Sequence, residues 1–203
     1  MKAKPKARST QATGSIRIIG GRWRGRKLPV LAADGLRPTT DRVKETLFNW
    51  LQFELQDAHV LDLFAGTGSL GLEALSRGAA VVTFAETQRP ACQQLASNLA
   101  MLEASGQIDS QGAEHCLQQL PAHSIDIAFI DPPFGKDWLQ RIIAPMETRQ
   151  LVADGGWVYV ESGVNDPFVS WPSAWHLHRE KRAGQVHSRL FRVRRENAQA
   201  ITD

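Results

Sequence analysis

A rigid acidic loop, Asp131-Pro132-Pro133-Phe134, has the residue types in this sequence that best suit a chemical reaction. Two consecutive prolines stiffen the backbone, so the Asp131 carboxylate and the Pro132 carbonyl are held as acceptors in fixed geometry. The Phe134 ring offers a face on which a planar base can stack. The loop therefore predicts a site that holds the amine of an extruded nucleobase while its nitrogen attacks an electrophile.

A second candidate site is the glycine-rich stretch VLDLFAGTGSLG at residues 60–71. Its apolar start is typical of a strand buried in a parallel sheet, and Gly66, Gly68 and Gly71 follow at once. The next residues have helical composition, so the loop would present backbone amides at a helix N-terminus. Such a glycine pattern also fits a turn that serves packing alone, so the neighbouring acids decide.

Two acids near this loop indicate which ligand it would bind. Glu86 ends the apolar run that starts at Val81, about 20 residues after Gly66, where a carboxylate can accept both hydroxyls of a ribose. Asp62 lies inside the strand end, where it would repel the pyrophosphate of a nicotinamide cofactor. S-adenosylmethionine carries cationic ammonium and sulfonium groups instead, so the acids favour S-adenosylmethionine.

The order of the predicted elements explains how the two candidate sites could meet. From residue 60 onward, apolar strands alternate with segments of helical periodicity. Strands are predicted at Val81–Glu86, near Ile108, and at Ile125–Ile130 and Trp157–Glu161, with helices at about Pro90–Ala104, Ala113–Leu120 and Trp138–Met146. Two further strands, Trp175–Lys181 and Val186–Arg194, flank Ala183-Gly184 and predict an antiparallel pair. The sum is a doubly wound, Rossmann-like α/β sheet, mostly parallel, whose strand ends share one ligand-binding edge.

Positive charge is concentrated at the N-terminus. Residues 1–33 hold nine Lys and Arg and no acid, which leaves 15 basic residues against 21 acidic ones in the rest of the chain. The pair Gly20-Gly21 predicts a two-residue turn that pairs Ile19 with Arg22. Alternation along the strands would then place one set of side chains on a common outer face, namely Arg17, Arg22, Arg24 and Arg26. Ile16, Ile18 and Trp23 would pack inward, so the hairpin would offer its arginines to a polyanion.

Composition limits the remaining possibilities. The 203 residues, 42% of them hydrophobic, suffice for one sizeable core, and the net charge is +3. No apolar run reaches membrane-spanning length, and the lysine-rich start lacks the apolar segment of a signal peptide. Cys92 and Cys116 are the only cysteines and lack metal-ligand spacing. We expect a monomeric cytoplasmic enzyme without a disulfide or a metal.

Five stretches together resemble the RsmD family, the class I bacterial 16S ribosomal RNA guanine-N2 methyltransferases. They are IRIIGGRWRGRKLPV from residue 16, LRPTTDRVKETLFNWL from residue 36, LDLFAGTGSLGLEALSRGA from residue 61, FIDPPF from residue 129 and HREKRAGQVHSRL from residue 178. The resemblance covers most of the chain. It implies methyl transfer from S-adenosylmethionine to the exocyclic N2 amine of a guanine in small-subunit ribosomal RNA, with this RNA or the small subunit as partner.

The resemblance also implies roles for individual residues. Catalysis falls to the loop Asp131, Pro132, Pro133 and Phe134, and cofactor binding to Asp62, Phe64, Gly66, Thr67, Gly68, Glu86 and Ala113. With RNA as the expected partner, the hairpin register predicts that Arg17, Arg22, Arg24 and Arg26 bind it. Such enzymes often have an Asn or Asp beside the adenine amine, whereas residues 111–114 here read QGAE, so backbone groups would have to contact adenine. The expected organisation is a disordered basic tail over residues 1–14, an RNA-binding β-hairpin extension over 15–35 and a methyltransferase domain over 36–203.

Two other functions fit part of the pattern. A DNA methyltransferase acting on adenine N6 or cytosine N4 could use the same tetrapeptide, although only residues 1–40 leave room for a target-recognition segment. A non-catalytic RNA-binding assembly factor could retain a vestigial cofactor site. The presence of Asp131 and Phe134 argues against a non-catalytic assembly factor.

Overall fold

The computed structural model describes residues 14–30, 41–167 and 169–195 of the chain. They form a seven-stranded sheet in the order β5-β4-β3-β6-β7-β9-β8 and a separate two-stranded sheet, β1-β2. The large sheet comprises β3 (His59–Asp62), β4 (Val81–Ala85), β5 (Gly106–Asp109), β6 (Ile125–Ile130), β7 (Val152–Gly163), β8 (Trp175–Ala183) and β9 (Val186–Val193). The neighbouring strands β5, β4, β3, β6 and β7 all pair in parallel, and β9 is antiparallel to both β7 and β8. The predicted doubly wound sheet with an antiparallel C-terminal pair is confirmed.

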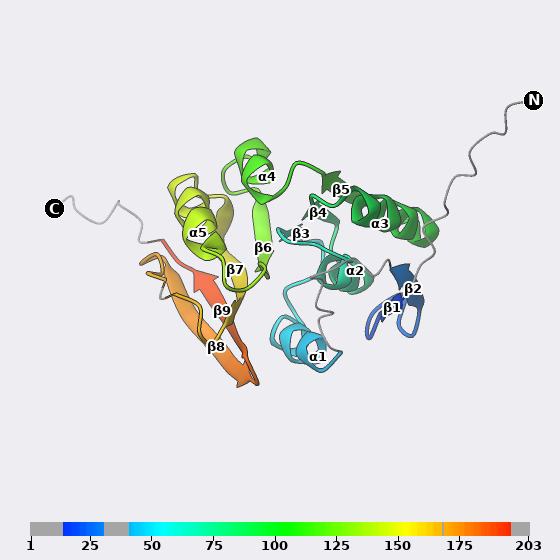
Figure 1. Ribbon diagram of the computed structural model, residues 1–203, viewed down its shortest axis with the longest axis horizontal. Helices are drawn as coiled ribbons and strands as arrows, with labels where there is room; N and C mark the ends of the chain where they lie inside the picture. The colour runs from blue at the N-terminus through cyan, green and yellow to red at the C-terminus, as the bar shows by residue number, and fades with distance from the viewer. Residues whose placement is uncertain (1–13, 31–40, 168, 196–203) are drawn as a thin grey trace, which may run out of the picture.

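Helices cover both faces of this sheet (Figure 1). They are α1 (Asp41–Trp50), α2 (Ser69–Ser76), α3 (Arg89–Leu102), α4 (Ala113–Gln119) and α5 (Trp138–Thr148). Buried side chains of α1, α2 and α3 form one core cluster with Val60, Phe84 and Phe129, whereas those of α4 and α5 form another with Leu61 and Ala128. Neighbouring strand residues thus point into opposite layers, as a sheet buried on both faces requires.

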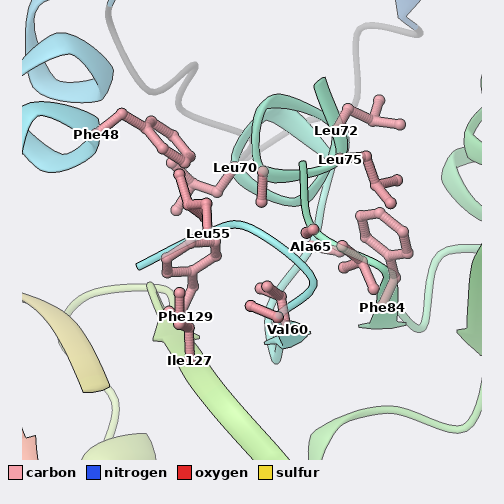
Figure 2. Packing of buried hydrophobic residues seen from close by; sticks show 14 of the residues in the cluster. Phe48, Leu55, Val60, Ala65, Leu70, Leu72, Leu75, Phe84, Ile127 and Phe129 are labelled. Carbon is pink, nitrogen blue, oxygen red and sulfur yellow. The ribbon is translucent and has the colours of Figure 1, made fainter. Parts of the chain in front are cut away.

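The first core layer fixes where the glycine-rich loop lies (Figure 2). Phe48 of α1 meets Phe129 of β6 edge to face, with ring centroids 5.9 Å apart. Leu70 and Leu72 of α2 are nearly inaccessible to solvent and belong to the same cluster. Helix α2 is therefore held against the sheet directly after β3, and its N-terminus is fixed beside the strand ends.

The N-terminal strand pair exists, but its predicted register is wrong. Strand β1 (Gly14–Arg17) pairs with β2 (Lys27–Val30), and Arg17 faces Lys27 instead of Arg24. Residues 18–26 form a longer connection, in which Gly21 has φ 74° and a Cβ there would lie 1.8 Å from the Ser76 carbonyl oxygen. The glycine pair thus permits close approach to α2, where the prediction had a two-residue turn.

Hydrogen bonds to α2 replace the ladder bonds that the prediction assumed. The Ile19 N–H donates to Glu73 Oε2 at 2.8 Å, the Arg22 N–H to the Ser76 carbonyl at 2.6 Å and the Trp23 N–H to Ser76 Oγ at 3.0 Å. Even so, Ile16 and Ile18 are buried, and the four arginines Arg17, Arg22, Arg24 and Arg26 are exposed. The expected division into an apolar inner face and a cationic outer face is present in a different register.

Some expectations fall on parts of the chain that the structure does not describe. They are the basic tail, apart from Gly14, and residues 31–35 at the end of the expected hairpin extension. Helix α1 begins at Asp41, the first residue that the structure describes after this gap. Within residues 14–30, 41–167 and 169–195, no helix combines the length and apolar character needed to cross a bilayer.

Candidate active site

A cavity of about 820 Å³ opens at the carboxyl ends of the parallel strands and contains most of the predicted site. It is lined by six of the seven predicted cofactor residues, Asp62, Phe64, Gly66, Thr67, Glu86 and Ala113, and by the whole acidic loop, Asp131, Pro132, Pro133 and Phe134. Gly68 and the four hairpin arginines are absent from its lining. The fold thus unites the two candidate sites in one cavity.

Glu86 organises the glycine-rich loop from the end of the neighbouring strand β4. Its Oε2 accepts the Gly66 N–H at 2.8 Å, and its Oε1 accepts the Gln88 N–H at 2.7 Å. Each carboxylate oxygen has a second lone pair, and the residue lines the cavity. Glu86 can therefore hold the loop and still accept the two hydroxyls of a ribose.

The buried end of β3 carries a carboxylate beside an unpaired hydroxyl. Asp62 Oδ2 accepts the Gly71 N–H at 3.0 Å, and burial raises the Asp62 pKa to about 7, further raised by the Glu86 charge and opposed by the Gly71 hydrogen bond. Ser69, the first residue of α2, lines the same cavity, and its Oγ has no hydrogen-bond partner among the described residues. A ligand ammonium would pair with Asp62, and a ligand carboxylate would suit Ser69 and the helix N-terminus. The pair fits the zwitterion of an α-amino acid.

The raised Asp62 pKa predicts a specific dependence of stability on pH. Between about pH 4 and pH 7 the folded protein keeps a proton on Asp62 that the unfolded chain has lost, so the free energy of unfolding falls as pH rises through this window. In Asp62→Asn the amide oxygen can still accept the Gly71 N–H but cannot titrate. We expect the wild-type stability, relative to Asp62→Asn, to fall by a few kcal/mol across the window, about 1.4 kcal/mol per pKa unit. Urea titrations at several pH values measure this; a pH-independent difference would contradict it.

Gly68 packs against α3 and is absent from the cavity lining. It has φ 78°, and a Cβ at this position would lie 2.5 Å from Leu95 Cδ1 of α3. Its cofactor contact stays a prediction. Near the start of α4, the cavity is lined by Gly112 and Ala113, while Gln111 is exposed and absent from the lining. That backbone groups of this stretch contact an adenine stays a prediction.

The acidic loop follows β6 and faces an aromatic wall. Phe64 and Trp138 meet edge to face with ring centroids 5.4 Å apart, and both line the cavity. The Arg141 guanidinium covers Trp138 at 4.2 Å from the ring centroid. Trp138 was predicted only as a helix residue, because nothing in its spacing indicates which way it points.

Glu161 is a second carboxylate at the reaction edge that sequence reasoning missed. Asp131 and Glu161 directly follow Ile130 and Val160, which pair on the parallel strands β6 and β7. Glu161 is buried, lines the cavity and accepts the Tyr159 O–H at 2.6 Å. Burial, reinforced by the Glu161 charge, raises the Tyr159 pKa well above its usual value, so Tyr159 stays a donor. The signal in the sequence was an acid ending a strand, the same signal that identified Glu86.

Comparisons with known proteins agree with this architecture. Ribosomal RNA small subunit methyltransferase D of Escherichia coli K12 is 51% identical over 181 residues, which are 88% of this chain and 90% of that protein. The enzyme of the same name from Haemophilus influenzae is 42% identical over 190 residues, 92% of this chain and 98% of that protein. The solved structure of yhhF from Escherichia coli has a TM-score of 0.82 and 51% identity, covering 89% of this chain and 99% of that one.

The family described as Conserved hypothetical protein 95 matches residues 16–192, from the first strand of the hairpin to the last strand of the sheet. The match thus spans both the N-terminal strand pair and every strand of the cavity-bearing sheet. The chain therefore belongs to the RsmD family.

Proposed function

We propose that this protein transfers the methyl group of S-adenosylmethionine to the N2 amine of a guanine in 16S ribosomal RNA. One observation carries the proposal: the loop Asp131–Phe134 shares a single cavity with Glu86 and the glycine-rich turn. The names of the relatives, ribosomal RNA small subunit methyltransferase D, support RNA of the small subunit as the substrate.

The donor set of the cavity fits S-adenosylmethionine. Glu86 suits the ribose hydroxyls, Asp62 the ammonium group, and Ser69 with the start of α2 the carboxylate. When bound, this cofactor supplies an electrophilic methyl group on a sulfonium sulfur. The protein's part is to hold it with that methyl toward the acidic loop.

The acidic loop prepares the amine for attack. The exocyclic amine is a weak nucleophile because its lone pair is delocalised into the ring. The Asp131 carboxylate and the Pro132 carbonyl can each accept one amine N–H, which favours a pyramidal nitrogen, and the low dielectric of the cavity strengthens both bonds. As the N–C bond forms and the C–S bond breaks, the nitrogen loses a proton, for which the Asp131 carboxylate is an acceptor.

The second carboxylate favours guanine as the base. Guanine presents two adjacent donors, N1–H and the N2 amine, whereas adenine and cytosine present an unprotonated ring nitrogen beside their amines. Asp131 directly follows β6, and Glu161 is an acceptor on the neighbouring strand β7, one residue beyond the pair Ile130 and Val160. A ring acceptor nitrogen placed against a buried carboxylate would bring two acceptors together with no hydrogen between them, so the pair of acids disfavours adenine and cytosine.

The assignment of guanine as the target base predicts both the reaction product and the effect of a substitution at Glu161. Labelled S-adenosylmethionine and unmethylated small subunits are expected to yield N2-methylguanosine on nucleoside analysis. We expect Glu161→Gln to lower kcat/KM by about 10- to 100-fold, the loss of one charged hydrogen bond. The ratio of the methylation rates of guanine and 2-aminopurine at the target position should be smaller for Glu161→Gln than for wild type. The reason is that 2-aminopurine keeps the amine but lacks the N1–H.

Glu114→Gln is the matched control, since Glu114 is exposed and pairs with Arg141 outside the cavity. N6-methyladenosine or N4-methylcytidine as the product, or methylation of duplex DNA alone, would refute the guanine assignment. An unchanged preference between guanine and 2-aminopurine in Glu161→Gln would remove Glu161 from base recognition.

The hairpin arginines are proposed to bind RNA phosphates around the target. Arg17, Arg22, Arg24 and Arg26 are all exposed, and none lines the reaction cavity. Exposed guanidinium groups suit phosphates through their planar fork of donors. Contacts of this kind position the RNA without reading its sequence.

A further inference from the structure

A second, smaller cavity lies beside the reaction cavity, between α1 and the turn that joins β8 to β9. Its volume is about 340 Å³. The walls come from α1 through Arg42, Val43, Thr46, Leu47 and Trp50, and from the strands through Tyr159, Lys181, Arg182, Ala183, Gly184 and Ser188. Apart from Tyr159, which donates to Glu161, none of these residues has a part in the chemistry above.

The charge of this cavity is one-sided. Arg42, Lys181 and Arg182 line it, and none of the lining residues is an acid. Lys181 Nζ donates to Thr46 Oγ1 at 3.1 Å, and Thr46 Oγ1 in turn donates to the Arg42 carbonyl at 3.0 Å. This chain ties the strand turn to α1 and holds the ammonium group in the cavity with two further donors. The site thus suits an anion with several acceptor oxygens.

The wall also contains an aromatic ring, which narrows the choice of anion. Trp50 lines the cavity and is half-buried against the core cluster that holds α1. A ring next to three cations fits a nucleotide, whose phosphate meets the cations while its base can stack on the indole. A free phosphate would make no use of the ring.

The two cavities share a wall. Val43, Ala183 and Ser188 line both of them. A base held against Asp131 in the larger cavity therefore has the smaller cavity as its immediate neighbour. An extruded nucleotide remains joined to its neighbours through phosphates, so the adjoining segment of the strand must leave the reaction cavity through its surroundings.

We infer that the smaller cavity binds the nucleotide next to the target guanine, with Arg42, Lys181 and Arg182 on its phosphate and Trp50 beside its base. The inference rests on the proposed function for the identity of the target. It gives the turn between β8 and β9 and the helix α1 a joint role in RNA positioning, separate from the hairpin arginines.

The test compares RNA binding by wild type and by Arg42→Ala/Arg182→Ala, two exposed positions whose truncation spares the core. The probes are unmethylated 16S ribosomal RNA and unmethylated small subunits. At about 0.1 M salt we expect the Kd to rise on the order of tenfold, and the slope of log K against log salt to fall by about one to two units. S-adenosylmethionine affinity should stay unchanged. Arg182→Ala is matched by Arg179→Ala, an exposed arginine on the same strand outside both cavities, which should leave the slope unchanged.

The possible outcomes separate this inference from the proposed function. An unchanged Kd and salt slope in an enzyme that still methylates guanine would overturn the nucleotide cavity alone. A wild type that binds RNA without methylating it would refute the proposed function, while a reduced slope in the double variant would still support the cavity. The double variant could also bind naked RNA as tightly as wild type and lose affinity only for assembled subunits. That result would mean that the cavity contacts a ribosomal protein, and it would overturn the inference.

Discussion

Replacing Asp131 by alanine is expected to lower the single-turnover rate of methyl transfer by about two to four orders of magnitude, while cofactor affinity stays nearly unchanged. The carboxylate directly follows β6 and lines the reaction cavity together with Glu161, which is on the neighbouring strand β7. It can accept an amine N–H, take up the departing proton and stabilise the positive charge that grows on nitrogen. None of these roles involves the groups that fit the cofactor.

Single-turnover rates at saturating cofactor, with calorimetry for cofactor binding, separate the two effects. Asp131→Asn should fall between wild type and Asp131→Ala, because the amide oxygen still accepts an N–H but carries no charge. Asp137→Ala is the control, since Asp137 is exposed on the same connection and absent from the cavity lining. An Asp131→Ala rate within a few fold of wild type would exclude Asp131 from the chemistry.

The predictions for the reaction site agreed with the structure where a strand end located the residue. Glu86 and Asp131 each follow a mainly apolar strand, and parallel strands direct their carboxyl ends to one edge whatever the packing details. Glu161 also ends a predicted strand, Trp157–Glu161, which lies within the longer β7. No neighbouring residues in the sequence form a motif that would have marked Glu161 as a site residue. Gly68 is absent from the cavity lining, because a glycine pattern cannot distinguish approach to a ligand from approach to a leucine side chain of α3.

The hairpin shows a different limit of sequence reasoning. Strand pairing was predicted on the assumption that residues 15–26 satisfy their own backbone groups. In the structure three of those N–H groups donate to Glu73 and Ser76, about 50 residues further along the chain. Such distant partners leave no trace in local periodicity. The predicted alternation of exposed arginines with buried apolar residues is nevertheless present, because Ile16 and Ile18 are buried in either register.

Glu73 itself is the charged residue that this docking depends on. It lies in α2, whose eight residues are all buried, and its own side chain is fully inaccessible. Its Oε1 accepts from Arg77 Nε at 2.7 Å, its Oε2 accepts the Ile19 N–H at 2.8 Å, and Lys44 Nζ lies 3.8 Å from Oε2. Lys44 is equally buried and also donates to the Arg17 carbonyl. One carboxylate thus joins the hairpin, α1 and α2.

Glu73→Ala is therefore expected to lower the free energy of unfolding by about 3–5 kcal/mol, because buried Lys44 loses its buried carboxylate partner and keeps only the exposed Asp41 at 3.8 Å. Urea denaturation measures the loss, and Glu45→Ala on the exposed side of α1 should change stability by less than about 0.5 kcal/mol. Glu73→Gln should lose less than Glu73→Ala, because an amide oxygen can still accept the Ile19 N–H.

A pH series distinguishes the unpaired charge from a simple cavity. Burial lowers the Lys44 pKa, and the Glu73 charge opposes this. Without Glu73 the folded-state pKa of Lys44 falls further below its unfolded value, so the unfolded chain binds more protons between the two values and stability rises with pH there. The deficit of Glu73→Ala should therefore shrink as pH is raised toward 10, whereas a deficit caused only by lost packing would not change. If the stability deficit of Glu73→Ala stayed constant across that range, Glu73 would stabilise the fold through packing and the Ile19 hydrogen bond. It would then not act by neutralising the Lys44 charge.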